Sequence, residues 1–283
     1  MDNSENFYPA GYTYAEKLCL SDLLREPLFR SLINSLKLPE GSRGLDIGCG
    51  TGSNTLILAD AVGSSGHVTG MDLSDELLMY AKQRADNAGF SQRISFLKCD
   101  MNRPAFINNT FDWVWSADCA GYAPGDAPNL IKNLAGLVKP GGSVFVLAWS
   151  SQQLLPGYPR LEARLNTTSA GTAPFVMGQQ PQSHILRALG GFRAAGLEDI
   201  EASTFVGDIQ APLGKEKRRA LASFFEMRWG KPDTELTEKE SMEYQRLCSP
   251  GSPDFIAAIP DYYGFFTYTL FRGRTASQST EQK

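Results

Sequence analysis

Residues 44–52 read Gly-Leu-Asp-Ile-Gly-Cys-Gly-Thr-Gly, an acid at the end of a short apolar run followed directly by a glycine turn. Because glycine has no Cβ, such a turn can bend tightly and let a ligand lie against the main chain. The dinucleotide-binding pattern GxGxxG would place its third glycine at position 53, where this chain has Ser53. Asp46 would repel a pyrophosphate bound at this turn, whereas it suits a ligand that carries an ammonium group.

The acid and the glycines of this turn match a known motif. Asp46, Gly48, Gly50 and Gly52 follow the pattern D-x-G-x-G-x-G, and here the chain resembles the class I S-adenosylmethionine-dependent methyltransferases. The resemblance implies that S-adenosylmethionine is the cofactor and S-adenosylhomocysteine the product. It also implies that Asp46 faces the methionine amino group, often through water, while the glycine loop passes under the methionine and the ribose.

Two further acids lie at the ends of strand-like runs. Residues 67–72 end in Asp72, about twenty residues after the glycine turn. A carboxylate at the tip of the neighbouring strand can accept two hydrogen bonds from a ribose diol, and we predict this role for Asp72. The next run ends in Asp100 and Met101. The resemblance implies that Asp100 accepts a hydrogen bond from the adenine amino group and that Met101 packs on the adenine ring.

Later segments supply the remaining motifs in the order that the family uses. Residues 111–117 read as a fourth strand that begins with a Phe-Asp pair. Residues 138–142, Val-Lys-Pro-Gly-Gly, read as a turn that opens a fifth strand over residues 143–149. The resemblance therefore extends over residues 44–149, the core of the chain rather than its ends.

The alternation of strands and helices predicts the fold. Short apolar runs are typical of parallel strands buried on both faces, and we expect Ser74 to cap a helix that Gly89 ends. The predicted architecture is α/β, a Rossmann-like, doubly wound, seven-stranded sheet that is mostly parallel and ends with strands at 197–209 and 263–272. The resemblance implies that the last strand runs antiparallel between the fifth and the sixth.

Segments outside the core predict the domain organisation. Residues 1–36 are predicted to form an N-terminal helical lid, with an aromatic packing arm as the alternative. The methyltransferase core takes residues 37–210 and 260–274. Residues 211–259 form an insertion before the last strand, and an insertion of this length is usually functional, so we predict a substrate cap. The polar tail at 275–283 is expected to be disordered.

Side chains near the predicted strand ends form the candidate site. Asp118 lies just past the fourth strand, where the family's acceptor pocket opens, and we predict it to be a catalytic base or an acceptor-orienting group, with helix capping as the alternative. The predicted cofactor-binding residues are Tyr14, Asp46, Gly48, Cys49, Gly50, Thr51, Gly52, Asp72, Leu73, Asp100, Met101 and Ser116. The predicted substrate-binding residues are Tyr8, Tyr122, Trp149 and Trp229.

Composition and charge narrow the class of protein. With 283 residues, 42% of them hydrophobic, and a net charge of −4, the chain can bury a substantial core. We expect no membrane span and no signal peptide. The chain has five cysteines, an odd number, without a CxxC spacing, which favours a reduced, cytoplasmic protein. The only basic cluster, residues 215–219, is interrupted by an acid, so we expect no nucleic-acid partner.

The expected chemistry is simple. We predict direct SN2 transfer of a methyl group from S-adenosylmethionine to a small-molecule acceptor, with the core most similar to the quinone-pathway and natural-product methyltransferases. An aminopropyltransferase on the same fold and a noncatalytic S-adenosylmethionine-binding protein are the alternatives. Thiolates from Cys119 with Cys99 or Cys248 could hold trivalent arsenic, but small apolar core residues are the simpler interpretation and we expect no metal site. The oligomeric state stays open.

Overall fold

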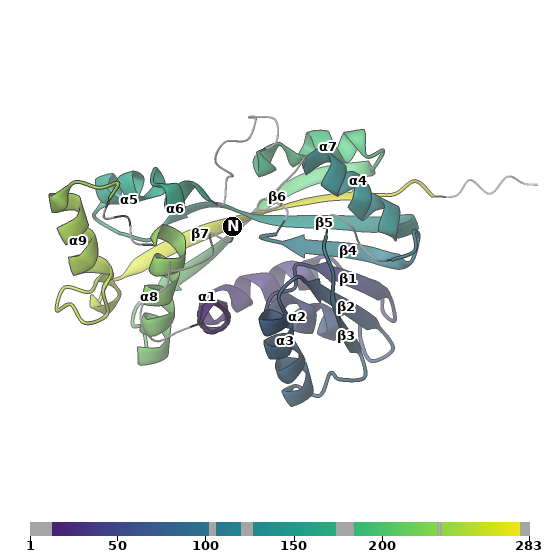
Figure 1. The fold of residues 1–283 in the computed structure, drawn as a ribbon, viewed down its shortest axis with the longest axis horizontal. Coiled ribbons are helices and arrows are strands. Elements are labelled where there is room, and N and C mark those ends of the chain that lie inside the picture. The colour runs from purple at the N-terminus through teal and green to yellow at the C-terminus, as the bar shows by residue number, and fades with distance from the viewer. Residues whose placement is uncertain are drawn as a thin grey trace, which may run out of the picture. The chain divides into compact units, whose positions relative to one another are not determined.

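The computed structural model describes residues 13–101, 106–119, 127–173, 184–230, 232 and 234–277. Within these residues the chain forms a seven-stranded sheet in the order β3-β2-β1-β4-β5-β7-β6, shown in Figure 1. The strands are β1 (Arg43–Ile47), β2 (His67–Asp72), β3 (Ile94–Lys98), β4 (Phe111–Ala117), β5 (Val138–Gln153), β6 (Glu198–Gln210) and β7 (Tyr263–Arg274). The longer helices are α1 (Tyr14–Ser35), α2 (Ser53–Ala61), α3 (Asp75–Asn87), α4 (Ala127–Leu137), α5 (Pro159–Asn166), α7 (Ala188–Ala194), α8 (Lys215–Trp229) and α9 (Glu238–Cys248), and a short α6 spans Ser169–Thr172.

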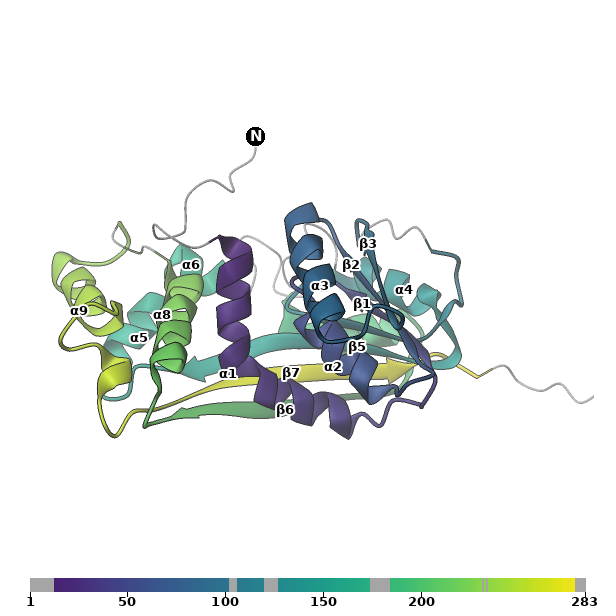
Figure 2. The ribbon, with the colours of Figure 1, turned by 90° about the horizontal axis from the view of Figure 1, so that it is seen from below.

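The direction of the strands confirms the predicted fold class. Strand β1 pairs in parallel with β2 on one side and with β4 on the other. Two further parallel pairs, β2 with β3 and β4 with β5, extend this part of the sheet. Strand β7 lies between β5 and β6, and its arrow points opposite to theirs in Figure 2. The Rossmann-like sheet with an antiparallel last strand between the fifth and the sixth is therefore the observed topology.

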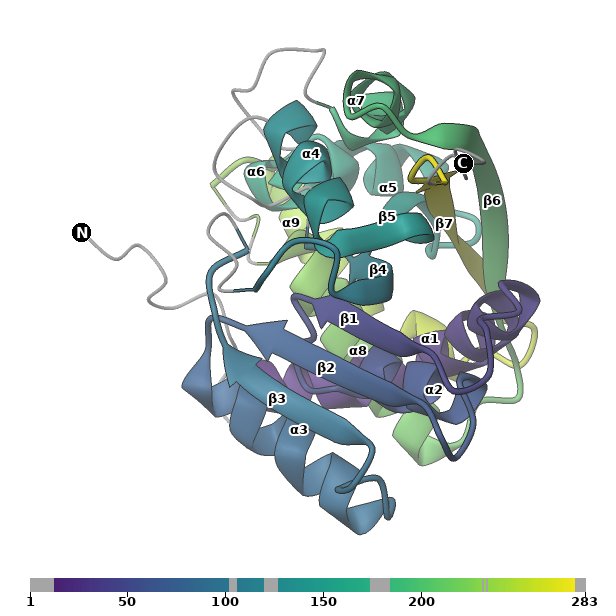
Figure 3. The same cartoon turned by 90° about the vertical axis from the view of Figure 1, so that its right-hand side faces the viewer.

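The chain divides into two compact units. One comprises Met1–Leu28, Ser151–Met177 and Val206–Thr267, and the other comprises Phe29–Ser150, Gly178–Phe205 and Tyr268–Lys283. We call the first the helical unit and the second the sheet unit. In the sheet unit, α4 and α7 cover one face of the sheet, and α2 and α3 cover the other (Figure 3). The predicted site residues fall mostly in the sheet unit, whose core is therefore the relevant scaffold.

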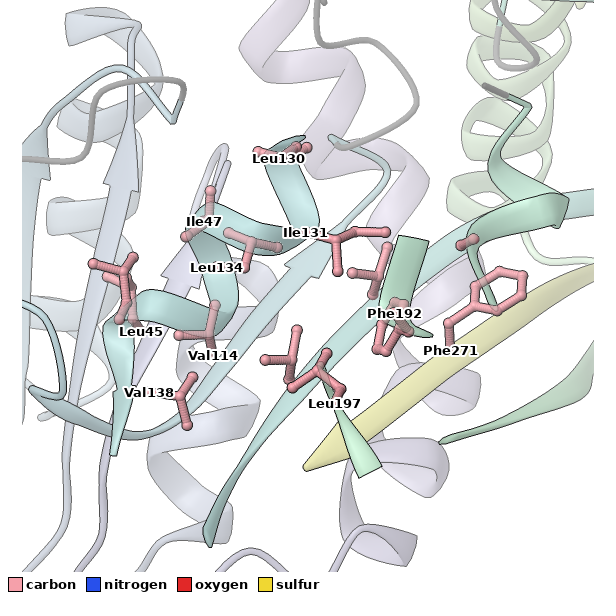
Figure 4. Close-up of a cluster of buried hydrophobic side chains, with 14 of the residues drawn as sticks. Leu45, Ile47, Val114, Leu130, Ile131, Leu134, Val138, Phe192, Leu197 and Phe271 are labelled. Carbon is pink, nitrogen blue, oxygen red and sulfur yellow. The ribbon is translucent and has the colours of Figure 1, made fainter. Parts of the chain in front are cut away.

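A cluster of buried apolar side chains holds α4 and α7 on the sheet (Figure 4). Strands β1 and β4 contribute Leu45, Ile47 and Val114, which point to this face because alternate residues of a strand share a face. Burial of one such side chain contributes roughly 1.5–3 kcal/mol. The helices and the other strands complete the cluster with Leu130, Ile131, Leu134, Val138, Phe192, Leu197 and Phe271. This packing fixes the ends of β1 and β4, from which the candidate site is built.

Gly44 lies on the opposite face of β1, next to a large aromatic side chain of β4. A Cβ at this position would lie 2.0 Å from the indole ring of Trp113, which is the partner of Gly44 on β4. The indole nitrogen of Trp113 donates a hydrogen bond to Ser42 Oγ over 2.9 Å. The indole ring of Trp113 thus occupies the space that a side chain at position 44 would need. Glycine is required here by packing.

Strand β5 is longer than the sequence predicts. The expected turn at residues 138–142 lies inside the strand, which runs on to Gln153 instead of ending at Trp149. Pairing with β4 shifts between Phe111 and Trp113, so that Val138 and Ser143 face residues only two apart. Residues 139–142 of β5 lie opposite Asp112 alone and form a bulge of three extra residues, in which Gly141 adopts a positive φ of 77°.

The helical unit contains the predicted apolar helix as α8. Leu221, Phe224, Phe225 and Trp229 are all buried on it, as the pattern in the predicted cap indicated. The Trp229 ring stacks on Phe225, with ring centroids 5.6 Å apart and planes inclined by 20°. Its indole nitrogen donates to Asn166 Oδ1 over 2.8 Å. No helix among the residues that the structure describes is long and apolar enough to cross a membrane.

Candidate active site

The glycine turn joins β1 to α2 at the carboxyl end of the sheet. Gly48, Gly50 and Gly52 all have positive φ values, of 71°, 54° and 80°, a region that side chains disfavour. The N–H groups of Gly48 and Cys49 both donate to the carbonyl oxygen of Met71, over 2.8 and 2.9 Å. The turn is therefore fixed to the end of β2, and its glycines are required by backbone conformation as well as by space.

Asp72 lies at the end of β2 and is bound to this turn. Its Oδ2 accepts a hydrogen bond from Gly50 N over 2.9 Å, and its Oδ1 accepts one from Ser74 N over 3.0 Å. Each carboxylate oxygen has a second lone pair, which stays available to a ribose hydroxyl. The following residue, Leu73, is 57% exposed. The structure thus brings Asp72 into contact with the glycine turn, although about twenty residues of sequence separate them.

Asp46 is buried beneath the turn. Its Oδ2 accepts a hydrogen bond of 2.6 Å from Thr55 Oγ1, which belongs to the first turn of α2. Burial raises the pKa of Asp46 to about 7, the hydrogen bond from Thr55 opposes this rise, and the negative charge of Asp72 adds to it. A buried carboxylate without a cation is costly. The site therefore suits a ligand that brings a positive group close to Asp46, as the amino group of S-adenosylmethionine would.

Replacing Asp46 with Asn is expected to stabilise the ligand-free protein at pH 8. The folded-state pKa of about 7 lies above the ordinary value of 3.8, so the folded protein holds a proton that the unfolded chain has already lost. Stability of the wild type consequently falls as the pH rises between these two values and stays low above them. Asparagine avoids this loss. Thermal unfolding should show the gain fully at pH 8, with about 2–4 °C in Tm for each kcal/mol, and less at pH 5. An equal difference in Tm between Asp46→Asn and the wild type at both pH values would contradict this account of Asp46.

Sulfur atoms gather beside the glycine turn. Cys119 lies against Gly48, where a Cβ would be 2.2 Å from its Sγ, and its Sγ is 3.9 Å from Met101 Sδ. Burial, followed by the charges of Asp72, Asp46 and Asp118, raises the pKa of Cys119 to about 12. The thiol is therefore neutral. In the described part of the chain, no group of three or more His, Cys, Asp or Glu side chains could hold a metal ion.

The predicted adenine residues lie just past β3, and Ser116 lies on β4. Asp100 and Met101 are half-buried, and Met101 packs against the sheet unit's apolar cluster. Ser116 is fully buried between Ile47 of β1 and Val146 of β5. Among the described residues its hydroxyl has no hydrogen-bond partner. These positions are compatible with a ligand at the strand ends, and the roles of the three residues stay predictions.

Asp118 lies one residue beyond β4 and adopts a positive φ of 51°. Its Oδ1 accepts a hydrogen bond from Trp149 N over 3.0 Å. Its own N–H donates to Leu147 O over 3.0 Å. The predicted catalytic acid and the predicted substrate residue Trp149 are thus joined through the backbone of β5, and Cys119 connects Asp118 to the glycine turn.

The other predicted contacts are distributed differently. Tyr8 and Tyr122 lie outside the described residues. Tyr14 begins α1, in the helical unit, and is 42% exposed. Trp229 is fully buried in the same unit, where it packs as described above, and that position gives no support to a direct substrate contact. The proposed roles of these residues also stay predictions.

Sequence reasoning overlooked two side chains that support the turn. Thr55 donates a hydrogen bond to Asp46. Its position could have been predicted, because a residue three positions after Gly52 lies in the first turn of α2 and can face the end of β1. Arg84 of α3 donates to Thr51 Oγ1 over 3.1 Å. Thr51 is itself buried, so its side chain is engaged within the protein. The hydrogen bond from Arg84 joins α3 to the glycine turn, and no local pattern in the sequence indicated it.

Comparisons with known proteins agree with this geometry. Residues 45–142 match the family model described as a methyltransferase domain. A demethylmenaquinone methyltransferase of Bacillus pumilus is 30% identical over 198 residues, covering 64% of this chain and 82% of the relative. The chain belongs to the class I S-adenosylmethionine-dependent methyltransferases. The predicted enzyme class and cofactor are confirmed with it.

Two other proteins are similar to this methyltransferase, one in part of its sequence and one in its fold. The demethylmenaquinone methyltransferase of Bacillus licheniformis is 34% identical over 129 residues, 44% of this chain, and the match spans about half (52%) of that relative. Among solved structures, the YcgJ protein from Bacillus subtilis matches with a TM-score of 0.57 at 18% identity, covering 88% of this chain and 98% of that one. At this level of identity the similarity of structure shows the fold alone.

Proposed function

We propose that this methyltransferase transfers a methyl group from S-adenosylmethionine to a small aromatic acceptor with a quinol-type hydroxyl, by direct displacement. The observation that carries the choice of donor is the bonding of Asp72 to the glycine turn above the buried Asp46. The choice of acceptor class is supported by the relatives that are named demethylmenaquinone methyltransferases. The predicted lid, core and cap, a cytoplasmic location and the absence of a nucleic-acid partner remain part of this proposal.

The residues present fit S-adenosylmethionine. Asp46 is a buried acid whose pKa is raised to about 7 by burial, so a positive group placed beside it would favour its charged form. The glycines of the turn carry no side chain that would separate a ligand from the main chain. Asp46 would hold the amino group, and Asp72 would hold the ribose diol. Once bound, the sulfonium supplies an activated methyl group with a neutral thioether as leaving group. The protein then has to align the acceptor with the methyl group and exclude water.

A hydroxyl-bearing acceptor adds one further demand. A phenolic hydroxyl holds its proton at neutral pH, and removal of that proton makes the acceptor a better nucleophile. We propose that Asp118 accepts this proton. Its O–H bond forms as that of the acceptor breaks, and the electron pair left on the acceptor becomes available for attack.

The test uses the purified protein with S-adenosylmethionine and a short-chain demethylmenaquinone reduced to its quinol. We expect S-adenosylhomocysteine and a product heavier by one methylene group, both measured by mass spectrometry. A control without quinol should give neither. Formation of methylthioadenosine from decarboxylated S-adenosylmethionine would favour an aminopropyltransferase instead. Tight binding of S-adenosylmethionine without turnover of this quinol or of other reduced quinones would contradict the proposed acceptor class.

A further inference from the structure

Asp118 is held from a second strand that the sequence does not connect with it. The hydroxyl of Tyr268, on β7, donates to Asp118 Oδ2 over 2.6 Å, although the two residues are 150 positions apart in the chain. Trp149 N donates to the other carboxylate oxygen over 3.0 Å. Both oxygens of Asp118 therefore have a donor from the protein, and all three residues belong to the sheet unit.

We propose that Tyr268 is a positioning residue that fixes the Asp118 carboxylate in its ionised form, ready to take the proton of a hydroxyl-bearing methyl acceptor. This inference rests on the proposed function, because it assumes that Asp118 serves the acceptor. It adds a residue from β7 to a site otherwise built from β1 to β5 and the residues that follow them.

The length of the bond supports a charged acceptor. Hydrogen bonds from a hydroxyl to a carboxylate are typically about 2.5–2.7 Å long and roughly twice as strong as neutral ones, and the Tyr268 bond lies within that range. Hydrogen bonds to the ionised form of a carboxylate favour that form. Two such donors hold a carboxylate in one orientation and favour its charged form, which is the form that can take a proton.

The surroundings of Tyr268 make its hydroxyl a precise donor. The side chain is only 1% exposed. The ring meets Phe29 edge to face, with centroids 4.9 Å apart and planes at 76°, and it meets Trp149 in the same manner at 5.4 Å and 81°. These contacts restrict the ring on two sides and favour the orientation in which its hydroxyl reaches Asp118. The positive φ of Asp118 is a conformation that aspartate tolerates better than most residues, and it orients the carboxylate toward these donors.

Other ionisable groups near Asp118 are less suited to take the proton of the acceptor. Cys119, the next residue, is a neutral thiol because its pKa is raised to about 12. Asp46 and Asp72 act on Cys119 as well, so negative charge from β1 and β2 reaches the same region. The hydrogen bonds that Trp149 and Tyr268 donate favour the ionised form of Asp118.

The test is the titration of Asp118 in the full-length protein. Carbon-13 labelling of the aspartate carboxyl groups lets NMR follow each one with pH, and the signal missing in Asp118→Asn identifies Asp118. In Tyr268→Phe, which keeps the ring and loses the hydroxyl, we expect the Asp118 midpoint to rise by about 1–2 pH units. The acid limb of kcat with the reduced short-chain demethylmenaquinone should move up by the same amount, with the Kd for S-adenosylhomocysteine unchanged.

Tyr262→Phe is the matched control. Tyr262 is equally buried, and its hydroxyl donates to Leu154 O over 3.0 Å in the helical unit. This variant loses a buried hydrogen bond without touching Asp118, so its Asp118 midpoint should equal that of the wild type. If Tyr268→Phe fails to fold, replacement of all tyrosines by 3-fluorotyrosine strengthens the phenol as a donor and should lower the midpoint.

Two results separate this inference from the proposed function. An unchanged Asp118 midpoint in folded Tyr268→Phe, or in the 3-fluorotyrosine protein, would overturn the role of Tyr268, whatever the enzyme methylates. Failure of the wild type to methylate reduced quinones would overturn the proposed acceptor. The titration of Asp118 needs no acceptor, so it would still measure the effect of the hydrogen bond from Tyr268. Asp118→Asn keeps an oxygen for Trp149 N, and its amide NH2 group can donate to the Tyr268 hydroxyl. It should therefore fold and bind S-adenosylhomocysteine but lose at least about 100-fold in kcat.

Discussion

Trp229→Ala is expected to lower the free energy of unfolding by about 3–5 kcal/mol, the range observed when a large buried aromatic side chain is removed from a core. Trp229 is fully buried, stacks on Phe225 and meets Tyr244 edge to face at 6.3 Å. Its loss would also leave Asn166 Oδ1 with a single donor, from Gln152. Chemical denaturation followed by circular dichroism gives the change directly.

Trp229→Phe is the matched control for this experiment. Phenylalanine keeps a ring beside Phe225 but loses the hydrogen bond to Asn166, so we expect a smaller loss of about 1–3 kcal/mol. The comparison also bears on the predicted substrate contact of Trp229. A loss below about 1 kcal/mol in Trp229→Ala, together with a raised KM for the acceptor, would contradict the packing role and favour the substrate role.

Asp72→Ala is expected to weaken the binding of S-adenosylhomocysteine by about 1–3 kcal/mol, because charge-assisted hydrogen bonds to the ribose would be lost. The same change removes the acceptor that holds Gly50 N, so the glycine turn would be less well fixed. Isothermal titration calorimetry at pH 8 measures the affinity of both proteins.

Asp75→Ala provides the control on the same stretch of chain. Asp75 begins α3, its side chain is 75% exposed, and it forms a surface ion pair with Lys98. A substitution there should change the binding free energy by less than about 0.5 kcal/mol. Equal affinity in wild type and Asp72→Ala would remove Asp72 from the cofactor site.

Much of the sheet unit follows from local sequence. The acids at 46 and 72 and the glycines between them specify a strand, a turn and a neighbouring strand end, and the structure brings them into direct contact. Ser74 was expected to cap α3, and its hydroxyl does accept from Leu77 N over 3.2 Å. Such features depend on residues a few positions apart or on the regular repeat of parallel strands, which the sequence carries.

Features that depend on residues far apart in the chain could not be predicted from local sequence patterns. The end of β5 was expected at Trp149, and the residues that follow, Ser-Ser-Gln-Gln, are polar. They remain in the strand because long-range pairing outweighs local preference. Tyr268 had no local signal either, since its partner Asp118 is 150 residues away. Its apolar neighbours indicated a strand, but not which side chain would face the site.

The exchange of volume between Gly44 and Trp113 has an evolutionary consequence. Neither position can change alone: a larger residue at 44 would collide with the indole ring, and a smaller one at 113 would leave a cavity beside bare backbone. Relatives that have a branched residue at the position of Gly44 should therefore have a smaller side chain at the position of Trp113. We therefore expect these two positions to change together during evolution.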